Sequence, residues 1–390
     1  LPAVATGGAL TVTHAPAASA TLGSGVNAAD LTIVQSGAST ADAVTLSLGA
    51  RSTGTLLGDI VASNTDTFTI SSAAAAASTT TIDDVTIASG AGTQSIIVSG
   101  AGGFSLGDLN AEIVSTSSVV GAVSITSLTN AVGSTTFTGG VGATTISAAG
   151  AANVSVTTGI GADNITTGAG DDEINVGNGV NTVVSAGGTD TIVGGNGVDT
   201  ITSGVGADIV TPGLGADVLI STTGVAFTAA VADRVIGFVG GSTGDKISIS
   251  IADVERSAVV TDLAASGSGS ITAGVSVVEE IVGGTPETLT AGDSVLVFTG
   301  ATFTNNTTFE AALVDSGATE ITLSGATQAA DAIIAVYSDG VDVHVVQVEM
   351  AGTSITSTGV NTTINTIITL TGNPSITAGE FVAANFDFVA

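Results

Sequence analysis

The stretch Thr157–Leu219 repeats every nine residues without a gap. It reads TTGIGADNI, TTGAGDDEI, NVGNGVNTV, VSAGGTDTI, VGGNGVDTI, TSGVGADIV and TPGLGADVL. Each nonad has glycine at its fifth position and, except at Ala186, a second glycine at its third. Two glycines so close together permit the positive φ angles of a tight turn. These glycines are Gly159, Gly161, Gly168, Gly170, Gly177, Gly179, Gly188, Gly195, Gly197, Gly204, Gly206, Gly213 and Gly215.

The seventh and ninth positions of the nonads are equally regular. The ninth residue is always aliphatic, and it follows the turn at the spacing of an inward-pointing residue in a short strand. One nonad therefore makes one turn and one strand, two nonads make a coil, and successive coils stack about 4.8 Å apart. This pattern predicts an all-β fold, an elongated parallel β-solenoid. The seventh residues are Asp163, Asp172, Asn181, Asp190, Asp199, Asp208 and Asp217.

Stacking of the coils would arrange the seventh residues in two columns on opposite edges. One column would hold Asp163, Asn181, Asp199 and Asp217, and the other Asp172, Asp190 and Asp208. Carboxylates stacked so closely repel one another unless a cation lies between them, and Ca²⁺ prefers oxygen ligands, including turn carbonyls. At most about five sandwiched calcium sites follow, the two beside the uncharged amide of Asn181 being weaker. The alternative is a metal-free solenoid whose aspartates only form turns.

The segment resembles the RTX calcium-binding nonapeptide, GGxGxDxUx, of proteins exported by type I secretion. The resemblance covers residues 157–219, and the chain departs from the pattern at its first glycine, which occurs only as Gly194. The resemblance implies a calcium-binding β-roll at 157–219 with Ca²⁺ as cofactor. It also implies that the nonad glycines and the seventh-position side chains contribute the ligands.

Composition restricts the partners of this chain of 390 residues. It has 34 acidic and four basic residues, which give a formal net charge of -30. Charged residues are 10% of the chain, against about 25% in a typical soluble domain. The negative net charge therefore comes from a shortage of basic residues and not from an excess of acidic ones. No basic patch for nucleic acid can form, and without cysteine no disulfide or thiolate metal site is possible. No apolar stretch is long enough to span a membrane as a helix.

The sequence pattern of the flanking segments predicts further β-structure. Residues 1–156 are predicted to be a degenerate solenoid that runs into the roll, or alternatively a separate β-sandwich, with helix expected only at Ser71–Ser78. Residues 220–254 resemble the strands that cap RTX rolls, and there Asp233 and Asp245 are expected either to bind calcium or to form surface turns. Residues 255–390 are predicted to be β-rich, with a hairpin at Ser338-Asp339-Gly340 and a short helix at Phe309–Val314. Residues from about 370 to 390 resemble the uncleaved type I secretion signal.

The function expected from the sequence is structural. H-E-x-x-H does not occur, and the G-x-S-x-G spacing at 103–107 and at 240–244 lies in glycine-rich β-structure with no helix expected after it. No metalloprotease motif or nucleophile elbow is therefore recognised, and no enzyme is expected. The whole chain is similar to RTX surface-layer (S-layer) proteins of Gram-negative bacteria, of the Caulobacter type. That similarity implies a protein of the extracellular cell surface, exported by the type I secretion apparatus and assembled by calcium into a self-associating lattice.

Other interpretations of the sequence stay open at this point. The chain is expected to be the C-terminal part of a longer protein, whose N-terminal part would contact a cell-surface polysaccharide. The first alternative function is an RTX adhesin or biofilm-matrix filament protein. The second is the non-catalytic RTX part of a secreted enzyme.

Overall fold

The chain forms two compact units, Leu1–Ala186 and Gly187–Ala390. The structure is a computed structural model. It describes residues 10–14, 18–22, 30–35, 43–48, 56–88, 93–129, 133–150, 153–221, 232–250, 262–263, 278–282, 287–289, 295–313, 321–323, 331–349, 363–372, 375–377 and 379–389.

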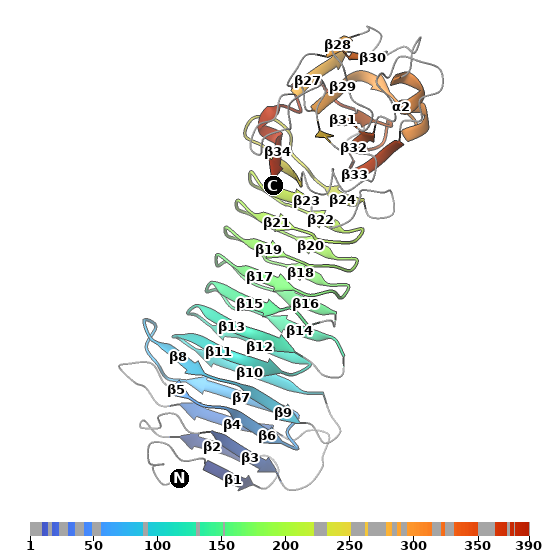
Figure 1. Ribbon diagram of the computed structural model, residues 1–390. Coiled ribbons are helices and arrows are strands. Elements are labelled where there is room, and N and C mark those ends of the chain that lie inside the picture. Colours follow the sequence, from blue (N-terminus) through green and yellow to red (C-terminus); the bar gives the residue numbers. More distant parts are fainter. Residues whose placement is uncertain are drawn as a thin grey trace. The chain divides into compact units, whose positions relative to one another are not determined.

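The first unit is a parallel β-solenoid built from two ladders of strands (Figure 1). One ladder contains β1 (Leu10–His14), β3 (Leu31–Gln35), β6 (Ile60–Ser63), β9 (Val85–Ala88), β11 (Gly103–Asn110), β13 (Val123–Thr129), β15 (Thr144–Ala148), β17 (Asn164–Thr167) and β19 (Thr182–Val184), with the short β5 (Leu56–Leu57) and β8 (Thr79–Ile82) beside it. The other contains β2 (Ala18–Leu22), β4 (Ala43–Leu48), β7 (Thr67–Ser72), β10 (Ser95–Gly100), β12 (Ile113–Val119), β14 (Thr135–Thr138), β16 (Val154–Thr157) and β18 (Glu173–Asn175).

Alternation of apolar and hydroxyl side chains explains these strands. In β7 the residues Phe68, Ile70 and Ser72 are buried, while the threonines and serine between them are partly exposed. Large side chains such as Phe104 and Phe137 fill the space between the two ladders and are at most 1% exposed. The pairing is parallel throughout the described strands of this unit, so these coils continue the solenoid toward the N-terminus and do not form a separate sandwich.

The prediction of a helix at Ser71–Ser78 is wrong. Strand β7 continues to Ser72, and the N–H of Ala73 donates to the carbonyl of Leu48 in the neighbouring coil at 2.9 Å. The hydroxyl of Ser72 accepts from the N–H of Ala74 and bonds the hydroxyl of Thr80. Pairing between coils therefore takes the backbone groups that a helix would need, and it overrides the helix propensity of the alanines.

The nonads form the coil geometry that their period predicts. Each strand pairs with the strand eighteen residues later, as Val156 with Ile174 and Ile165 with Val183 in the first unit. In the second unit Ile201 pairs in the same way with Leu219. The ninth-position side chains are buried at 4% exposure or less: Ile165, Ile174, Val183, Ile192, Ile201, Val210 and Leu219. The predicted parallel β-solenoid is therefore confirmed.

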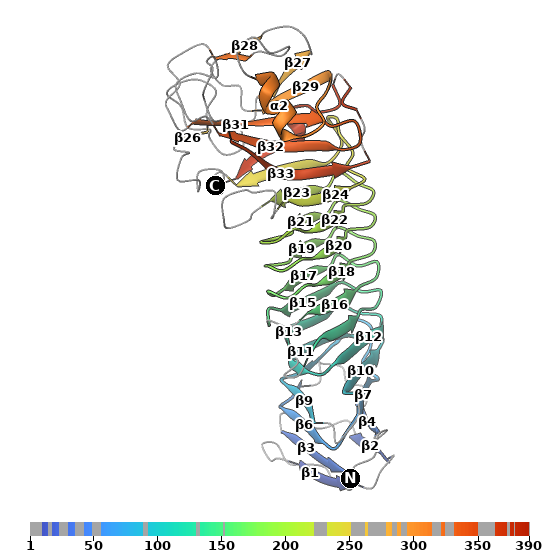
Figure 2. The same cartoon turned by 90° about the vertical axis from the view of Figure 1, so that its right-hand side faces the viewer.

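The second unit contains two ladders that end in the C-terminal region (Figure 2). The first runs through β21 (Thr200–Thr202), β23 (Val218–Ser221), β25 (Lys246–Ser250) and β34 (Phe386–Val389). The second runs through β20 (Thr191–Val193), β22 (Ile209–Thr211), β24 (Asp233–Ile236), β33 (Thr363–Thr371), β32 (Val343–Glu349), β31 (Asp331–Ser338), β29 (Val295–Thr302) and β27 (Val278–Val282). Strand β26 (Asp262–Leu263) pairs with β31, and β28 (Glu287–Leu289) with β30 (Ile321–Leu323).

The last coil of the roll is covered by strands that lie far ahead in the sequence. Strand β24 pairs with β33, and β25 with β34, so the edges of the last coil are paired. Short η1 (Ala383–Asn385) precedes β34. Of the segment predicted to cap the roll, residues 222–231 and 251–254 lie outside the described residues.

Beyond the roll, the two local predictions agree with the structure. Strands β31 and β32 form the antiparallel hairpin expected at Ser338-Asp339-Gly340. Helix α2 (Asn306–Leu313) begins three residues earlier than expected, because Asn305 caps it by accepting the N–H of Thr308 at 3.0 Å. Phe309 of this helix stacks on Tyr337, with ring centroids 4.3 Å apart. Among the described residues, no helix has the length and apolar character needed to cross a bilayer.

Candidate calcium-binding columns

The coil register of the first unit stacks the seventh-position residues on one another. The N–H of Asp163 donates to Oδ1 of Asn181 at 2.9 Å, and the N–H of Thr144 donates to Oδ1 of Asp163 at 2.7 Å. On the opposite edge the N–H of Val154 donates to Oδ1 of Asp172 at 2.8 Å. Each of these side chains therefore binds the backbone of the coil before it.

The second unit repeats this arrangement on both edges. The N–H of Asp190 donates to Oδ1 of Asp208, and the N–H of Asp199 donates to Oδ1 of Asp217, both at 2.8 Å. The predicted stacking of seventh-position side chains eighteen residues apart is thus present in each unit. One oxygen of each of these carboxylates has a structural task, which is to hold adjacent coils in register.

The second carboxylate oxygen is available for a ligand at three of these positions. Oδ2 of Asp163, of Asp208 and of Asp217 is buried and has no hydrogen-bond partner. These three residues are at most 2% exposed. A buried carboxylate oxygen without a partner is costly, and a divalent cation between the coils would satisfy it. The residues present therefore fit a calcium ion.

Electrostatics of the columns leads to the same conclusion. Burial raises the pKa of Asp163 and that of Asp217 above the usual range of a carboxyl group. Burial, reinforced by the charge of Asp190, raises the pKa of Asp208 to about 6. Each buried column thus resists carrying negative charge, and a bound cation would reverse that tendency.

Asp233 and Asp245 extend the columns beyond the last nonad. Oδ1 of Asp233 accepts the N–H of Asp208 at 3.2 Å, and Oδ1 of Asp245 accepts the N–H of Asp217 at 3.0 Å. Their second oxygens also have partners, the hydroxyl of Ser203 for Asp233 and the N–H of Val239 for Asp245, each at 2.8 Å. Burial and repulsion from Asp208 raise the pKa of Asp233 to about 8. Both residues are buried and hydrogen-bonded, so they are not surface turns, and calcium binding by them stays a prediction.

The nonad glycines are required for two different reasons. A positive φ occurs at Gly177, Gly179, Gly188, Gly195, Gly197, Gly204, Gly206 and Gly213. At Gly213, with φ +108°, an added Cβ would also lie 1.8 Å from the carbonyl oxygen of Gly195 in the coil before it. Close approach alone explains Gly159, Gly161, Gly168 and Gly215, where an added Cβ would lie within 2.6 Å of the neighbouring coil's backbone.

Main-chain carbonyls are needed to complete any calcium site in these turns. Among the described residues, no group of three or more His, Cys, Asp or Glu side chains gathers at one point. Calcium takes six to eight oxygen ligands, and backbone carbonyls are common among them. Glycine turns that bring successive backbones together supply such oxygens beside the aspartate columns.

Comparison with protein families agrees with this chemistry. The family model of the RTX calcium-binding nonapeptide repeat matches residues 155–183 and 184–219, in four copies. The chain carries RTX calcium-binding repeats. Calcium is therefore the cofactor of this region, and proteins with such repeats are typically secreted and extracellular. No curated protein and no solved structure matches the chain.

One further RTX-like turn precedes the matched segment. Residues 138–146 read TGGVGATTI, in which Thr144 stands at the seventh position. Gly140 and Gly142 are packed as in the nonads, since an added Cβ on either would lie 2.2 Å from a carbonyl oxygen of the coil before. A search of the sequence for the nonad pattern would have found this turn if it had accepted threonine at position seven and one repeat of ten residues between this turn and the first nonad. It supplies a backbone N–H to Asp163 but no carboxylate.

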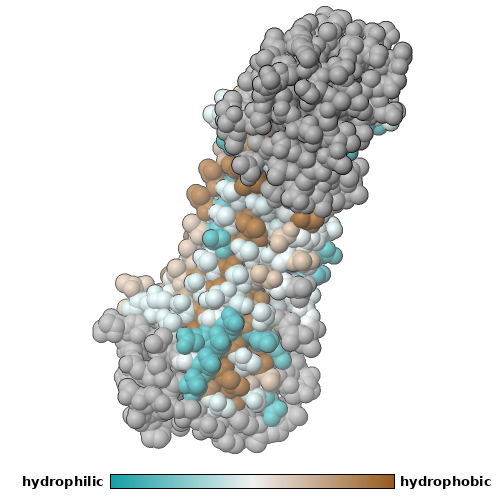
Figure 3. Space-filling view, in the orientation of Figure 1, coloured by the Kyte–Doolittle hydropathy of each residue, from teal (hydrophilic) through white to brown (hydrophobic). Residues whose placement is uncertain are grey.

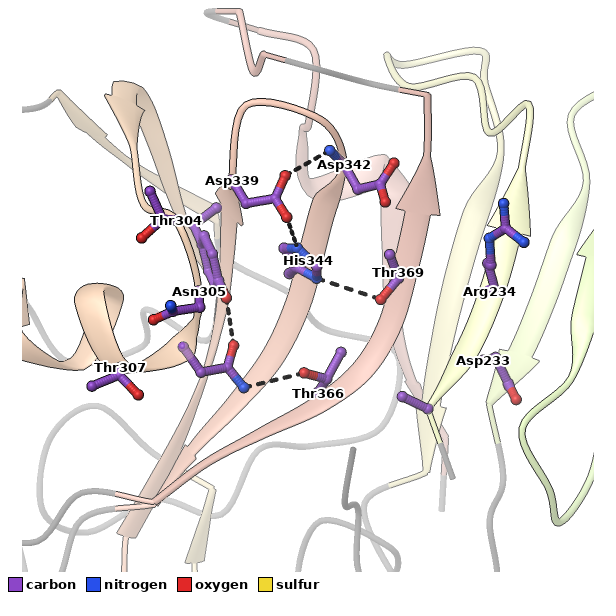
Figure 4. A pocket seen from close by; sticks show the side chains of 13 residues that line it. Asp233, Arg234, Thr304, Asn305, Thr307, Asp339, Asp342, His344, Thr366 and Thr369 are labelled. Atoms are coloured by element: carbon purple, nitrogen blue, oxygen red, sulfur yellow. Dashed lines mark hydrogen bonds and ion pairs between the residues drawn. The ribbon is translucent and has the colours of Figure 1, made fainter. Parts of the chain in front are cut away.

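A separate polar pocket of about 500 Å³ lies in the second unit (Figure 4). At its centre Nε2 of His344 lies 3.0 Å from Oδ2 of Asp339, and Nδ1 lies 3.4 Å from the hydroxyl of Thr369. Oδ1 of Asp339 accepts the N–H groups of Val341 and Asp342 in the turn between β31 and β32. These bonds join the hairpin turn to β32 and β33, so the described contacts of His344 are those of a packed, hydrogen-bonded residue.

Proposed function

We propose that this chain is the lattice-forming part of a structural S-layer protein of a Gram-negative bacterium, folded and assembled by calcium after type I secretion. The observation that carries the proposal is the stacked aspartate whose second carboxylate oxygen is buried and lacks a partner, as at Asp208 and Asp217. Such a column is stable only with cations, so the fold of the roll depends on the calcium of its surroundings.

The calcium gradient across the cell envelope supplies the switch. In the cytosol calcium is scarce, the aspartate columns repel, and the chain stays unfolded and exportable. Outside, calcium near 10⁻³ M fills sites of the extracellular class, whose dissociation constants are about 10⁻⁴–10⁻³ M. Each site filled to ten times its dissociation constant stabilises the folded state by about 1.4 kcal/mol, and several sites add.

The position of the C-terminal segment supports this order of events. Phe386 and Phe388 of β34 are at most 3% exposed, and β34 pairs with β25 of the last coil. A secretion signal within residues 370–390 is therefore accessible only while the chain is unfolded. Export has to precede folding, and calcium outside the cell then completes both the roll and its cap.

We also propose that the chain has no catalytic activity of its own. Its formal net charge of -30 and its shortage of basic residues fit a structural role, in which calcium neutralises the acidic surfaces of neighbouring copies of the chain. H-E-x-x-H does not occur in the sequence. The two G-x-S-x-G matches lie within β11 (103–107) and in the turn before β25 (240–244), not between a strand and a helix as a nucleophile elbow requires.

Circular dichroism and electron microscopy of the purified chain test the proposal. With chelator we expect the β-sheet signal to fall, and with calcium at about 10⁻³ M we expect it to return, together with ordered two-dimensional sheets. Fibres in place of sheets would favour the RTX adhesin or biofilm-filament alternative. A β-sheet signal that is the same with chelator and with calcium would overturn the folding switch.

A further inference from the structure

The turn tips on one edge of the first unit carry exposed aliphatic side chains. Val120, Val141, Ile160 and Val180 come from four successive coils, and they are 57%, 51%, 63% and 64% exposed. Val123 pairs with Thr144, Thr145 with Asn164, and Asn164 with Thr182, so the tips that precede these residues stack along the same edge. We call these four residues the aliphatic ridge. At about 4.8 Å per coil the ridge is about 15 Å long.

The fold itself does not require the ridge. Val141 and Ile160 stand at the fourth position of their nine-residue turns, and Val180 stands at the sixth, after the exposed Asn178 at the fourth. On the opposite edge of the same unit Ala169 occupies the fourth position. The described tips of that edge also include the exposed Ala149, Ala186 and Asp171. One edge thus presents large aliphatic side chains, and the other presents alanine and a carboxylate. Contiguous exposed apolar surface of this kind marks an interaction site.

Charge indicates what covers the ridge. The turns that carry it, residues 119–123, 139–144, 158–163 and 177–181, contain one charged residue, Asp163, which is 2% exposed. A chain of net charge -30 repels a second copy of itself over most of its surface. An uncharged edge with protruding aliphatic side chains is where two such copies can approach with the least repulsion and the largest apolar gain.

The hydropathy of the surface also changes along the first unit. Figure 3, in the orientation of Figure 1, shows hydrophilic residues gathered over the lower, N-terminal coils of the first unit. Mostly pale and brown residues cover the coils that follow them. In the second unit Val198, at the sixth position of its nonad, is 49% exposed, and Leu214, at the fourth position, is 72% exposed. Val205 on the other edge is 41% exposed as well.

We infer that the aliphatic ridge is a self-association surface, on which the ridge of a second copy packs against the first. The inference rests on the proposed lattice function and names the contact that this function needs. Ridge meeting ridge is an isologous contact, in which a residue such as Ile160 lies near its own counterpart in the other copy. Calcium in the turns behind the ridge would hold the tips in place.

Cysteine crosslinking tests the contact directly, because the chain contains no cysteine. In calcium, Ile160→Cys treated with a short bis-maleimide should give a crosslinked dimer. The matched control Ala169→Cys, at the same nonad position on the opposite edge, should stay monomeric on a denaturing gel. Equal crosslinking of both variants, or none with Ile160→Cys, would overturn the inference.

A substitution experiment separates this inference from the proposed function. We expect the triple variant Val141→Asn, Ile160→Asn, Val180→Asn to associate at least about tenfold more weakly than wild type in sedimentation velocity. The control with asparagine at Ala149, Ala169 and Ala186 should associate as wild type does, and circular dichroism in calcium verifies that both are folded. If wild type and the folded ridge variant both form sheets, the assignment of the ridge as the contact surface is wrong, while the proposed lattice function is unaffected. If wild type stays monomeric in calcium, the contact surface and the lattice function are both wrong.

Discussion

At the scale of single residues, the aspartate at position seven has two tasks that its two oxygens divide. Oδ1 accepts a backbone N–H from the previous coil, as Asp217 does from Asp199. Oδ2 of Asp163, of Asp208 and of Asp217 is buried without a hydrogen-bond partner. The sequence predicted the position of this side chain and its charge, because the nonad period is strict. It could not predict the division between the oxygens, which depends on the rotamer that the coil spacing imposes.

Replacing Asp217 by asparagine separates these tasks. The amide keeps an oxygen for the N–H of Asp199 but loses the charge, so the register should hold while calcium binds less tightly. We expect the calcium midpoint for folding to rise by about tenfold, and stability in chelator to be unchanged or higher because a buried charge is gone. Calcium titration followed by circular dichroism measures both. Glu112→Gln, which removes a charge in the first unit away from the columns, is the control. A midpoint that shifts equally in both variants would refute a specific site.

Protons should partly replace calcium in the columns. The pKa values of Asp208 and Asp233 are raised to about 6 and about 8, whereas an unfolded aspartate titrates near 3.9. Between about pH 8 and pH 4 the calcium-free folded state therefore binds protons that the unfolded state does not, and its stability rises as the pH falls. Circular dichroism in chelator at pH 8 and at pH 5 measures this, because the β-sheet signal that is lost at pH 8 should partly return at pH 5. Asp208→Asn should flatten the difference, and a signal that falls toward pH 5 would contradict the prediction.

At the scale of elements, the period of nine established the coils but not where they begin and end. Strand, turn and eighteen-residue pairing follow from glycine spacing and from the ninth aliphatic residue. Turn 138–146 was missed because threonine replaces the aspartate. The pairing of β33 and β34 with the last coil was not predicted, because no local sequence pattern indicates which distant strand will pair with an open sheet edge.

Gly213→Ala tests the glycine requirement of the turns. Its φ of +108° is unfavourable for alanine, and the new Cβ would lie 1.8 Å from the carbonyl oxygen of Gly195, so adjacent coils would have to separate. We expect a loss of about 3 kcal/mol in the free energy of unfolding with calcium present. Gly150→Ala is the matched control, since nothing lies within 4 Å of the added Cβ. Denaturant unfolding of the two variants compares them, and equal losses would argue against the strained turn.

Asn385 joins the C-terminal strand to the end of the aspartate column. It is 0% exposed, and its Nδ2 donates to the carbonyls of Gly241 and Asp245 while Oδ1 accepts N–H groups of Gly241 and Val382. Asn385→Ala should destabilise the second unit by about 2–4 kcal/mol, because these backbone groups lose their partners in a buried place. Thermal unfolding in calcium measures the loss. The partly exposed Glu380, whose Oε2 accepts the N–H and the hydroxyl of Thr377, is changed to glutamine as the control. A loss as large there would contradict the role of Asn385.

At the scale of the whole molecule, the distribution of carboxylates decides where calcium is needed. The described coils of the first unit ahead of the nonads bury Phe68, Phe104 and Phe137 and have Val123 and Thr144 at the seventh-position site. They therefore have a larger apolar core and no buried carboxylate at that point. The nonads bury smaller aliphatic residues and a carboxylate in almost every turn. Composition alone, with its net charge of -30, could not show this difference, because it averages over both segments.

Hydrogen exchange should reveal that difference along the chain. In chelator we expect backbone amides of residues 157–219 to exchange at rates near those of an unfolded chain, because the columns repel and few large side chains hold the coils. Amides of β10 to β13, residues 95–129, should exchange more slowly at the same pH, since burial of Phe104 and its neighbours does not depend on an ion. Addition of calcium to about 10⁻³ M should protect the nonads and leave the earlier coils little changed. Protection of both segments that is equal with and without calcium would mean that apolar packing alone stabilises the roll, since a column of ionised carboxylates without cations could not give that result.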